Sequence, residues 1–407
     1  MKKILAYYNG WGEHWHLGTL AHGENDLLFE YSPEAIKNGL ELSPPNLRLR
    51  AEAYGGFPKY LQRLPGLIAD SLPDGWGLLV MDRDFQKNGI NPATLSPLDR
   101  LAFLGSRTMG ALTFEPADDL KLATEDVKLL ELAAEAETIV KGKDTDALHK
   151  LALMGGSPQG ARPKVLVHYN KQNGAMSTAP VADTQPWLVK FQARDEHKEA
   201  CALEDLYAQL ARECGLDVPE THYFDLSDKL AGFGIARFDV EDGMRVPIHT
   251  LAGMLHADYS IPSIDYNTFL RATRTVTRDE REVQRAYERA AFNVVFHNRD
   301  DHSKNFSFRL GRDRNWRLAP CYDLTFSEGP GGEHQMAVCG EARNITRTQM
   351  LDLAKLAGLD TDWAKAALDK VVERAGRFKE LAATRPVRRP TVKKIVDAIE
   401  ANRKRVA

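Results

Sequence analysis

The chain has 407 residues, which is long for one compact core and typical of two or three domains. Its apolar fraction of 43% and charged fraction of 27% are those of a globular protein in water, and a net charge near −3 gives no reason to expect nucleic-acid binding over the whole surface. No apolar run approaches the roughly 20 residues that cross a bilayer, so the composition argues against a membrane-spanning class.

The N-terminus starts with basic residues, but polar residues and glycines interrupt the apolar run that a signal peptide needs. The four cysteines, Cys201, Cys214, Cys321 and Cys339, are scattered without CxxC spacing. We therefore expect reduced, buried thiols rather than disulfides or a zinc site. A cytoplasmic location is the expectation that follows from both observations.

Residues 1–108 open with two alternating segments, ILAYY and HWHLGTL, joined by NGWGE, which predicts a strand, a glycine turn and a second strand. LLFEY extends this sheet. SLPDGWGLLVMDRDFQK predicts a turn that enters a helix, with Asp74 as its cap. His14 and His16 lie two residues apart on one strand face, as a metal pair or as surface residues, and no third ligand at a usable spacing supports the metal pair.

Residues 109–245 alternate strand and helix patterns in a way that favours a nucleotide-binding lobe. GALTFEP predicts a strand, VKLLELAAEAETIVKG a helix, and the glycine cluster MGGSPQGARPK follows. VLVHYN and WLVKFQ predict strands on either side of a polar turn, and Lys190 lies near the end of the second. EACALEDLYAQLARECGLDV has apolar residues at helical spacing and ends at Gly215, a natural C-cap.

Residues 246–407 read mostly as helix, with one break near residues 297–330 that holds most of the polar chemistry. The tail after Thr384, RPVRRPTVKKIVDAIEANRKRVA, is rich in basic residues. It predicts a final amphipathic helix with a solvated basic face, and a nucleic-acid contact is the alternative. The chain thus divides into three expected parts, residues 1–108, 109–245 and 246–407.

The segment FHNRDDHSKNFSFRL, followed by WRLAPCYDLTFS, carries the chemistry. Asp300 and Asn305 lie five residues apart, and Asp323 comes eighteen residues later, at the end of a strand-like run. Phosphoryl transfer needs a carboxylate near the attacking hydroxyl and oxygen ligands that hold Mg²⁺ on the nucleotide phosphates. The loop supplies the first carboxylate and one metal ligand, and the second Asp supplies the main metal bridge. The joint pattern predicts a Mg²⁺–ATP reaction centre.

Two upstream features fit the same site. Lys190 can neutralise the α and β phosphates of ATP, and Glu204 on the following helix is placed to pair with it. The loop Gly155–Gly160 can present backbone amides to phosphate, although it spells neither a Walker motif nor GxGxxG. A lone strand lysine is usually a solvated edge residue and such a loop is often an ordinary turn, so both assignments depend on the reaction centre.

The segments MGGSPQGARPK, WLVKF, ALEDLYAQLARECGLDVPE, ARFD, NRDDHSKNFS and YDL occur in the order seen in the HipA-like serine/threonine kinases of bacterial toxin–antitoxin systems. The stretch from YNGWGEHWHLGTL to SLPDGWG is similar to the extra N-terminal domain of that family, so the chain resembles it over nearly the whole length. The resemblance implies an α+β, two-lobed protein-kinase-like fold with a small N-terminal α+β domain and a helical C-terminal lobe. It implies ATP and Mg²⁺ as cofactors.

The resemblance also implies a role for each matching residue. The catalytic base would be Asp300, His302 and Lys304 would complete the catalytic loop, and the magnesium ligands would be Asn305 and Asp323. The nucleotide-binding set would be Lys190, Glu204, Gly156, Ser157, Gly160, Arg237 and Phe238, of which Arg237 and Phe238 form a hinge beside the adenine. Ser157 lies where the family carries its self-phosphorylated serine. Pro158 beside it and Asp301 beside the base can alter loop movement and substrate choice.

Three functions stay open at this stage. The first is a toxin kinase that phosphorylates itself and a translation component such as an aminoacyl-tRNA synthetase, with a small DNA-binding antitoxin as partner. This chain shows no helix-turn-helix signature, so operator binding would be indirect, and no membrane partner is expected. The second is a small-molecule kinase of the aminoglycoside or choline type, which Asp300, His302 and Asn305 also suit. The third, a non-catalytic scaffold, is disfavoured because every phosphate- and metal-handling residue is present.

Overall fold

The computed structural model describes residues 1–24, 26–117, 122–143, 145–155 and 158–407. These residues form two compact units. The first unit comprises Met1–Cys201, Glu220–His249 and Gly253–His256, and the second comprises Ala202–Pro219, Thr250–Ala252 and Ala257–Ala407. Both contain helices and strands, so the expected α+β class is confirmed. Within the described residues, no helix combines the length and apolar character that crossing a bilayer requires.

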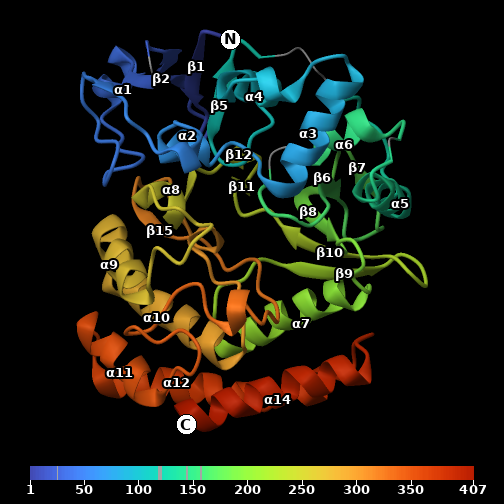
Figure 1. The fold of residues 1–407 in the computed structure, drawn as a ribbon, viewed down its shortest axis with the longest axis vertical. Coiled ribbons are helices and arrows are strands. Elements are labelled where there is room, and N and C mark those ends of the chain that lie inside the picture. The colour runs from blue at the N-terminus through green and yellow to red at the C-terminus, as the bar shows by residue number, and fades with distance from the viewer. Residues whose placement is uncertain (25, 118–121, 144, 156–157) are drawn as a thin grey trace. The chain divides into compact units, whose positions relative to one another are not determined.

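A five-stranded antiparallel sheet in the order β4-β3-β2-β1-β5 opens the first unit (Figure 1). Its strands are Lys3–Tyr8 (β1), Trp15–His22 (β2), Leu27–Tyr31 (β3), Ala53–Tyr54 (β4) and Leu112–Glu115 (β5). Every second residue of β3 is buried, because successive side chains of a strand point to opposite faces. The predictions of strands at ILAYY, HWHLGTL, LLFEY and GALTFEP are confirmed.

The helices that follow β3 belong to the same part of the first unit. They are Pro33–Asn38 (α1), Gly66–Ala69 (α2), Gly75–Lys87 (α3) and Pro97–Leu104 (α4), with 3₁₀ turns at Lys59–Leu61 (η1) and Pro92–Thr94 (η2). Helix α3 begins directly after Asp74, as predicted, but the Asp74 side chain makes no capping hydrogen bond. Its carboxylate instead accepts a hydrogen bond from the backbone N–H of Gly160. Asp74 is therefore the N-cap residue of α3, as predicted, but its carboxylate binds a distant loop instead of the first turn of the helix.

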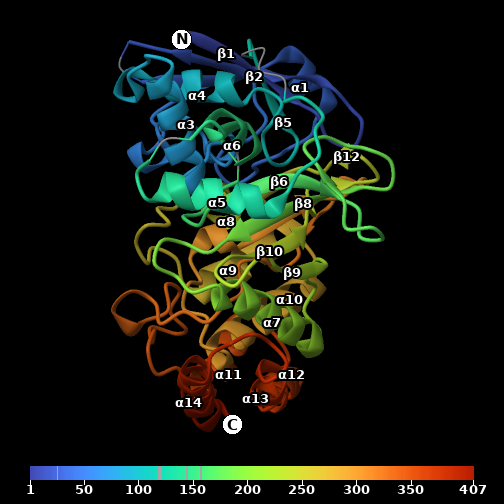
Figure 2. The same cartoon turned by 90° about the vertical axis from the view of Figure 1, so that its right-hand side faces the viewer.

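The second sheet of the first unit has the order β7-β6-β8-β10-β9. Its strands are Lys164–Tyr169 (β6), Met176–Ser177 (β7), Gln185–Phe191 (β8), Thr221–Asp225 (β9) and Ala231–Ala236 (β10), with the small pair Val240–Glu241 (β11) and Met244–Arg245 (β12) beyond it. Helices Leu129–Val140 (α5) and Leu148–Gly155 (α6) contact β10 and β6 respectively (Figure 2). The strands predicted at VLVHYN and WLVKFQ are confirmed.

Helix Glu199–Cys214 (α7) starts in the first unit and continues in the second. It ends where predicted, because Gly215 adopts φ +92°, a conformation that favours glycine, and its N–H bonds the carbonyl of Arg212 at 2.9 Å. Strand Ile248–Thr250 (β13) and helix Leu251–Leu255 (α8) likewise contain residues of both units.

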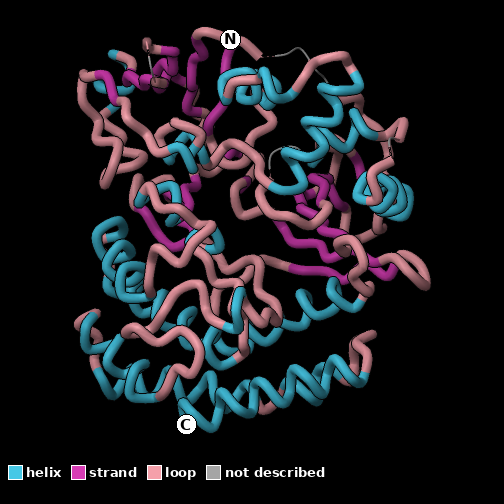
Figure 3. The backbone as a smooth tube through the Cα atoms, viewed as in Figure 1, coloured by secondary structure: helices cyan, strands magenta, loops and turns pink. Residues whose placement is uncertain are grey.

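The rest of the second unit is mainly helical, as expected for the residues after 245 (Figure 3). Its helices are Tyr266–Thr277 (α9), Glu280–Val295 (α10), Arg347–Leu356 (α11), Thr361–Ala375 (α12), Phe378–Ala382 (α13) and Arg389–Val406 (α14). The hairpin Ser307–Leu310 (β14) and Trp316–Leu318 (β15) and the 3₁₀ turns Ser303–Asn305 (η3) and Pro330–Gly332 (η4) complete it. Helix α10 contacts α9, α12 and α14.

Aromatic packing builds the core of the second unit around Tyr207 of α7. Its ring lies 6.3 Å from that of Phe292, 6.1 Å from that of Phe296 and 6.0 Å from that of Phe378, measured between centroids. The buried Tyr207 hydroxyl donates to the carbonyl of Phe296 at 2.8 Å, so the cluster buries no unsatisfied hydroxyl at this position. These contacts join α7, α10 and α13 into one core.

The C-terminal helix α14 is amphipathic, as predicted. It buries Ile395, Ile399 and Val406, while Lys393, Lys394 and Lys404 are exposed. Helices α11, α12 and α13 all contact it. The solvated basic face expected from the sequence is therefore present on this helix.

All four cysteines lie among the described residues and are free thiols. Cys201, Cys214 and Cys321 are buried, as expected. The expectation of burial is wrong for Cys339, which is exposed because it lies in a loop between residues 333 and 346 rather than on a core-facing helix or strand.

A buried ion pair in the loop after β10 binds the chain segment just before β5. The guanidinium of Arg237 donates to both carboxylate oxygens of Asp239, at 2.9 and 2.7 Å, and the N–H of Gly110 donates to the same carboxylate at 2.8 Å. Burial alone would raise the pKa of the Asp239 carboxyl, but the Arg237 charge and these hydrogen bonds outweigh burial and lower that pKa. Arg245 adds donors to the carbonyls of Gly110 and Thr108, both at 2.6 Å.

We predict that Asp239→Asn lowers the free energy of unfolding by about 3–5 kcal/mol at pH 7, because it leaves the Arg237 charge buried without its partner. The folded-state pKa of Asp239 is depressed, so its stabilising contribution is present above the unfolded value of about 3.9 and is lost as the pH falls below it. Urea denaturation at several pH values should show the difference between wild type and variant shrinking toward low pH.

The control is Asp313→Asn, which breaks a bidentate ion pair between Asp313 and Arg317. Both side chains of this pair are about half exposed. That change should cost less than about 1 kcal/mol. Equal losses for the two variants would contradict the assigned importance of burial.

Candidate active site

The site begins where helix α10 ends. After Val295 the chain turns sharply, with His297 at φ +58° and the N–H of Asn298 bonded to the carbonyl of Asn293 at 2.9 Å. The side chain of Asn298 also donates to Asn293 Oδ1, at 2.9 Å. These bonds close a turn at the C-terminal end of α10, and the loop that carries Asp300 follows this turn directly.

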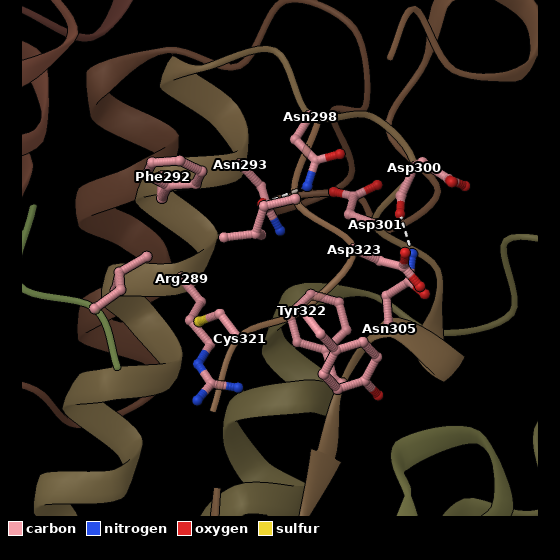
Figure 4. Close-up of a pocket in the computed structure, with 13 residues that line it drawn as sticks. Arg289, Phe292, Asn293, Asn298, Asp300, Asp301, Asn305, Cys321, Tyr322 and Asp323 are labelled. Carbon is pink, nitrogen blue, oxygen red and sulfur yellow. Dashed lines mark hydrogen bonds between the residues drawn. The ribbon is translucent and has the colours of Figure 1, made fainter. Parts of the chain in front are cut away.

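Asp300 and Asn305 are brought together by the short turn η3. The side-chain amide of Asn305 donates to the backbone carbonyl of Asp300 at 2.6 Å (Figure 4). Because the amide nitrogen is used in this way, the amide oxygen of Asn305 is the atom left to act as a ligand. The Asp300 side chain is 50% exposed, so its carboxylate is accessible to a substrate hydroxyl.

Asp323 is held next to this loop through the residue that precedes it. The Tyr322 hydroxyl donates to the carbonyl of Lys304 at 2.8 Å and lies 2.5 Å from the hydroxyl of Ser307. Asp323 itself adopts φ +55°, a left-handed conformation that Asp and Asn tolerate better than most residues. The two segments that carry the predicted carboxylates are thereby fastened to each other.

The position of Asp323 differs from the prediction in one respect. The sequence predicts a strand that ends at Asp323, whereas β15 ends at Leu318 and Asp323 lies in the following loop. The strand stops there because Pro320 has no N–H to donate to a ladder. The loop conformation makes the left-handed backbone of Asp323 possible.

These residues line one pocket that lies wholly within the second unit. The pocket contains about 330 Å³ of space, part of it open to solvent. Its polar lining includes Asp300, Asn305 and Asp323, and its apolar lining includes Leu216 and Phe292 (Figure 4). Cys321 also lines it, but burial raises the pKa of its thiol, which argues against a nucleophilic thiolate.

His302 and Lys304 lie in the same loop. Nε2 of His302 is 3.7 Å from Oδ1 of Asp300, beyond hydrogen-bonding distance, and its buried Nδ1 has no hydrogen-bond partner in the described part of the chain. The ammonium of Lys304 lies 3.8 Å from the centroid of the Tyr259 ring, a favourable cation–π distance. Tyr259 thus directs the Lys304 charge, a contact that no feature of the sequence signals.

Lys190 and Glu204 are both buried, with relative exposures of 7% and 2%. Lys190 lies on β8, and its ammonium is 5.8 Å from the centroid of the Phe233 ring on the neighbouring strand. Glu204 lies on the part of α7 that belongs to the second unit. The pairing of these two residues joins two separate units and stays a prediction.

Of the remaining nucleotide-binding candidates, Gly160, Arg237 and Phe238 belong to the first unit. Gly156 and Ser157 lie outside the described residues. The N–H of Gly160 is engaged by Asp74, so in this conformation it is not available to a phosphate. The guanidinium of Arg237 is engaged by Asp239, and a role of Arg237 and Phe238 beside adenine would therefore use the backbone.

The donor set fits a nucleotide-borne Mg²⁺ ion. Such an ion takes one or two protein oxygen ligands and completes its shell with phosphate oxygens and water, which the Asp323 carboxylate and the Asn305 amide oxygen satisfy. The described residues contain no group of three His, Cys, Asp or Glu side chains that would form an independent metal cage. His14 and His16 engage Asn9 Oδ1 at 3.1 Å and the carbonyl of Gly18 at 3.0 Å, respectively.

Comparison with protein families matches both parts of the chain. Residues 9–115 match the HipA N-terminal domain, and residues 156–378 match the HipA-like C-terminal domain, which is more than half of the chain. A search of curated proteins found no match.

Comparison with solved structures finds HipA from Shewanella oneidensis MR-1, in a complex with HipB and its operator DNA. The TM-score is 0.71 at 18% sequence identity, over 99% of this chain and 96% of that chain. The Helicobacter pylori proinflammatory kinase CtkA gives a TM-score of 0.40 at 13% identity, over 56% of this chain and 86% of that chain. The first likeness confirms the expected two-lobed fold with an extra N-terminal domain.

Proposed function

The chain belongs to the HipA family, and from this premise we propose that it is an ATP-dependent serine/threonine protein kinase that acts as a toxin of a toxin–antitoxin pair. The observation that carries the proposal is the convergence of Asp300, Asn305 and Asp323 on one pocket. We further propose that it phosphorylates itself and a translation component such as an aminoacyl-tRNA synthetase, and that it acts in the cytoplasm.

Each residue of the pocket has a distinct part in the proposed transfer. Asp300, which is half exposed, orients the attacking hydroxyl and accepts its proton. Asn305 and Asp323 would hold Mg²⁺, which neutralises charge on the phosphates of ATP when it is bound. Lys304, directed by the ring of Tyr259, places a positive charge where negative charge develops on the transferred group.

Two further residues complete the proposal, Lys190 of the first unit and Glu204 of the second. Lys190 would contact the ATP phosphates, with Glu204 as its partner, as in other kinases. Their near-complete burial supports this, because a buried charge is stable only when another charge or a set of hydrogen bonds compensates it. The second candidate, a small-molecule kinase, would use the same pocket, but the match of residues 9–115 to the HipA N-terminal domain favours the protein kinase.

We predict that Asp300→Asn lowers phosphoryl transfer by about 10² to 10⁴-fold with little change in stability. Asp323→Asn should weaken Mg²⁺-dependent ATP binding, because it removes the main anionic ligand while keeping a residue that tolerates φ +55°. Radiolabel transfer from ATP in a cell lysate measures the first effect and a thermal-shift titration with Mg-ATP the second. Asp352→Asn, a half-exposed acid of α11, is the control.

Two results would contradict the assignment. Near-normal transfer by a folded Asp300→Asn variant would exclude Asp300 as the base. Label that appears only in small metabolites of the lysate, and not in protein, would favour the small-molecule kinase.

We also propose that phosphorylation of Ser157 inhibits the enzyme. A phosphate there adds about −1.5 to −2 charges to the loop expected at the ATP phosphates, and it competes with them for the same donors. Incubation with Mg-ATP followed by phosphosite mapping should find phosphate on Ser157, and ATP affinity should fall afterwards. Ser157→Ala should keep its affinity under the same treatment. An unmodified Ser157 in an enzyme that actively phosphorylates another protein would refute the proposal.

The proposed partner is a small DNA-binding antitoxin, since the Shewanella HipA structure contains HipB and operator DNA. The exposed basic residues of α14 would add phosphate contacts to such a complex, although Lys393 and Lys394 already pair with Asp397 at 2.5 Å and Glu328 at 2.8 Å. Lys404, which is also exposed, is the better candidate for a phosphate contact.

We predict that the tagged chain, purified from its native cells, brings down a small DNA-binding protein. In that complex Lys404→Gln should reduce the slope of log affinity against log salt by about one, because one phosphate contact is lost. Lys365→Gln, an exposed lysine of α12, should leave the slope unchanged. Tight, sequence-specific DNA binding by the purified chain alone would contradict this division of roles.

A further inference from the structure

Two adjacent acidic residues in the loop after α10 have opposite surroundings. The side chain of Asp300 is 50% exposed, whereas that of Asp301 is fully buried. Figure 4 shows Asp301 near Asn293 and Asn298, which line the same pocket. A buried carboxylate destabilises a fold unless hydrogen bonds compensate it, so the partners of Asp301 indicate what it does.

Three donors from outside the loop bind the Asp301 carboxylate. Oδ2 accepts from the Tyr266 hydroxyl and from Nδ1 of His334, both at 2.7 Å, and Oδ1 accepts from the backbone N–H of Gln335 at 2.7 Å. Tyr266 begins helix α9, and His334 and Gln335 follow Asp323 along the chain. One side chain therefore ties the Asp300 loop both to a helix and to the segment beyond Asp323.

A second layer of hydrogen bonds holds the first in place. Asn293 Nδ2 donates to the Tyr266 hydroxyl at 3.0 Å, and Asn298 Nδ2 donates to Asn293 Oδ1 at 2.9 Å. Asn293, Asn298 and Tyr266 are all buried. These two bonds resist movement, because a displacement would leave a buried amide N–H without its acceptor. Asn298 Oδ1 is a buried atom without a partner among the described residues.

The residue on the other side of Asp300 makes equivalent connections. The N–H of Arg299 bonds the carbonyl of Ser327 at 3.3 Å, and its guanidinium donates to the carbonyls of Gly332 at 2.5 Å and Arg343 at 2.8 Å. We call residues 327–343 the tethered segment. Asp300 is thus flanked by two residues, Arg299 and Asp301, that both bind this segment.

From this geometry we propose that Asp301 is a positioning residue, which fixes Asp300 relative to Asp323 by binding Tyr266, His334 and Gln335. The proposal rests on the proposed kinase function. In many kinases the segment after the metal-binding Asp becomes ordered only when a phosphate pairs with an arginine. Here backbone carbonyls of the tethered segment accept hydrogen bonds from the guanidinium of Arg299, so this arginine is engaged without a phosphate.

The test compares Asp301→Asn with wild type by kinetics and by hydrogen exchange. The amide removes one acceptor and adds a donor that faces other donors, so the tether opens. We expect kcat to fall roughly 10- to 100-fold, since small misplacements of reacting groups have effects of this size, while KM for ATP stays within about twofold. Hydrogen exchange in residues 327–343, and at the amide of Gln335 above all, should become faster.

Two changes at His334 separate positioning from folding. His334→Asn keeps a side-chain N–H close to the place of Nδ1 and should retain kcat, whereas His334→Leu removes the donor and should behave like Asp301→Asn. If Asp301→Asn does not fold, the comparison of these two His334 variants still tests the positioning role of Asp301. Asp352→Asn, at a half-exposed acid outside the pocket, serves again as the control.

The outcomes distinguish this proposal from the proposed function. A wild type without any phosphoryl transfer would refute the kinase assignment, while hydrogen exchange would still report on the tether. An active wild type, with kcat and exchange unchanged in Asp301→Asn, would overturn the positioning role. Equal kcat for His334→Leu and His334→Asn would overturn it as well.

Discussion

Helix α10 buries three polar side chains, Glu282, Arg289 and Asn293, and each must find a hydrogen-bond partner away from water. Glu282 accepts from the N–H of Leu318 at 2.9 Å, and Arg289 donates to the carbonyl of Ala319. Both partners belong to the chain that leads from β15 to Asp323. Asn293 serves the loop that carries Asp300. One helix thus determines where both carboxylates lie, and its burial in the aromatic core of the second unit keeps it in place.

The convergence of Asp300, Asn305 and Asp323 on one pocket was predictable from sequence because these residues are close together in the chain. Asp300 and Asn305 come from one turn, and Asp323 from the loop after the next hairpin, so local geometry brings them together. Strands and helices with clear periodicity were predictable for the same reason. Strand β15 ends at Leu318, before Pro320, whereas the prediction extended the strand to Asp323. The prediction gave too little weight to Pro320, which interrupts the run.

The contacts that were not predictable join residues far apart in the chain. Asp74 with Gly160, Tyr259 with Lys304, and Asp301 with His334 are separated by tens of residues, and no periodicity reports on such pairs. The fold is similar to that of Shewanella HipA although only 18% of the residues are identical, so most individual side-chain contacts are not needed to specify it. A fold persists when the pattern and volume of its core persist, while the individual side chains change.

The left-handed backbone of Asp323 has a consequence for how this chain can drift over evolutionary time. Most side chains at φ +55° strain the backbone by about 1–2 kcal/mol, whereas Asn and Gly fit it readily. A copy of this chain that carries Asn or Gly at this position is therefore expected to stay folded and to present the same surface of the second unit.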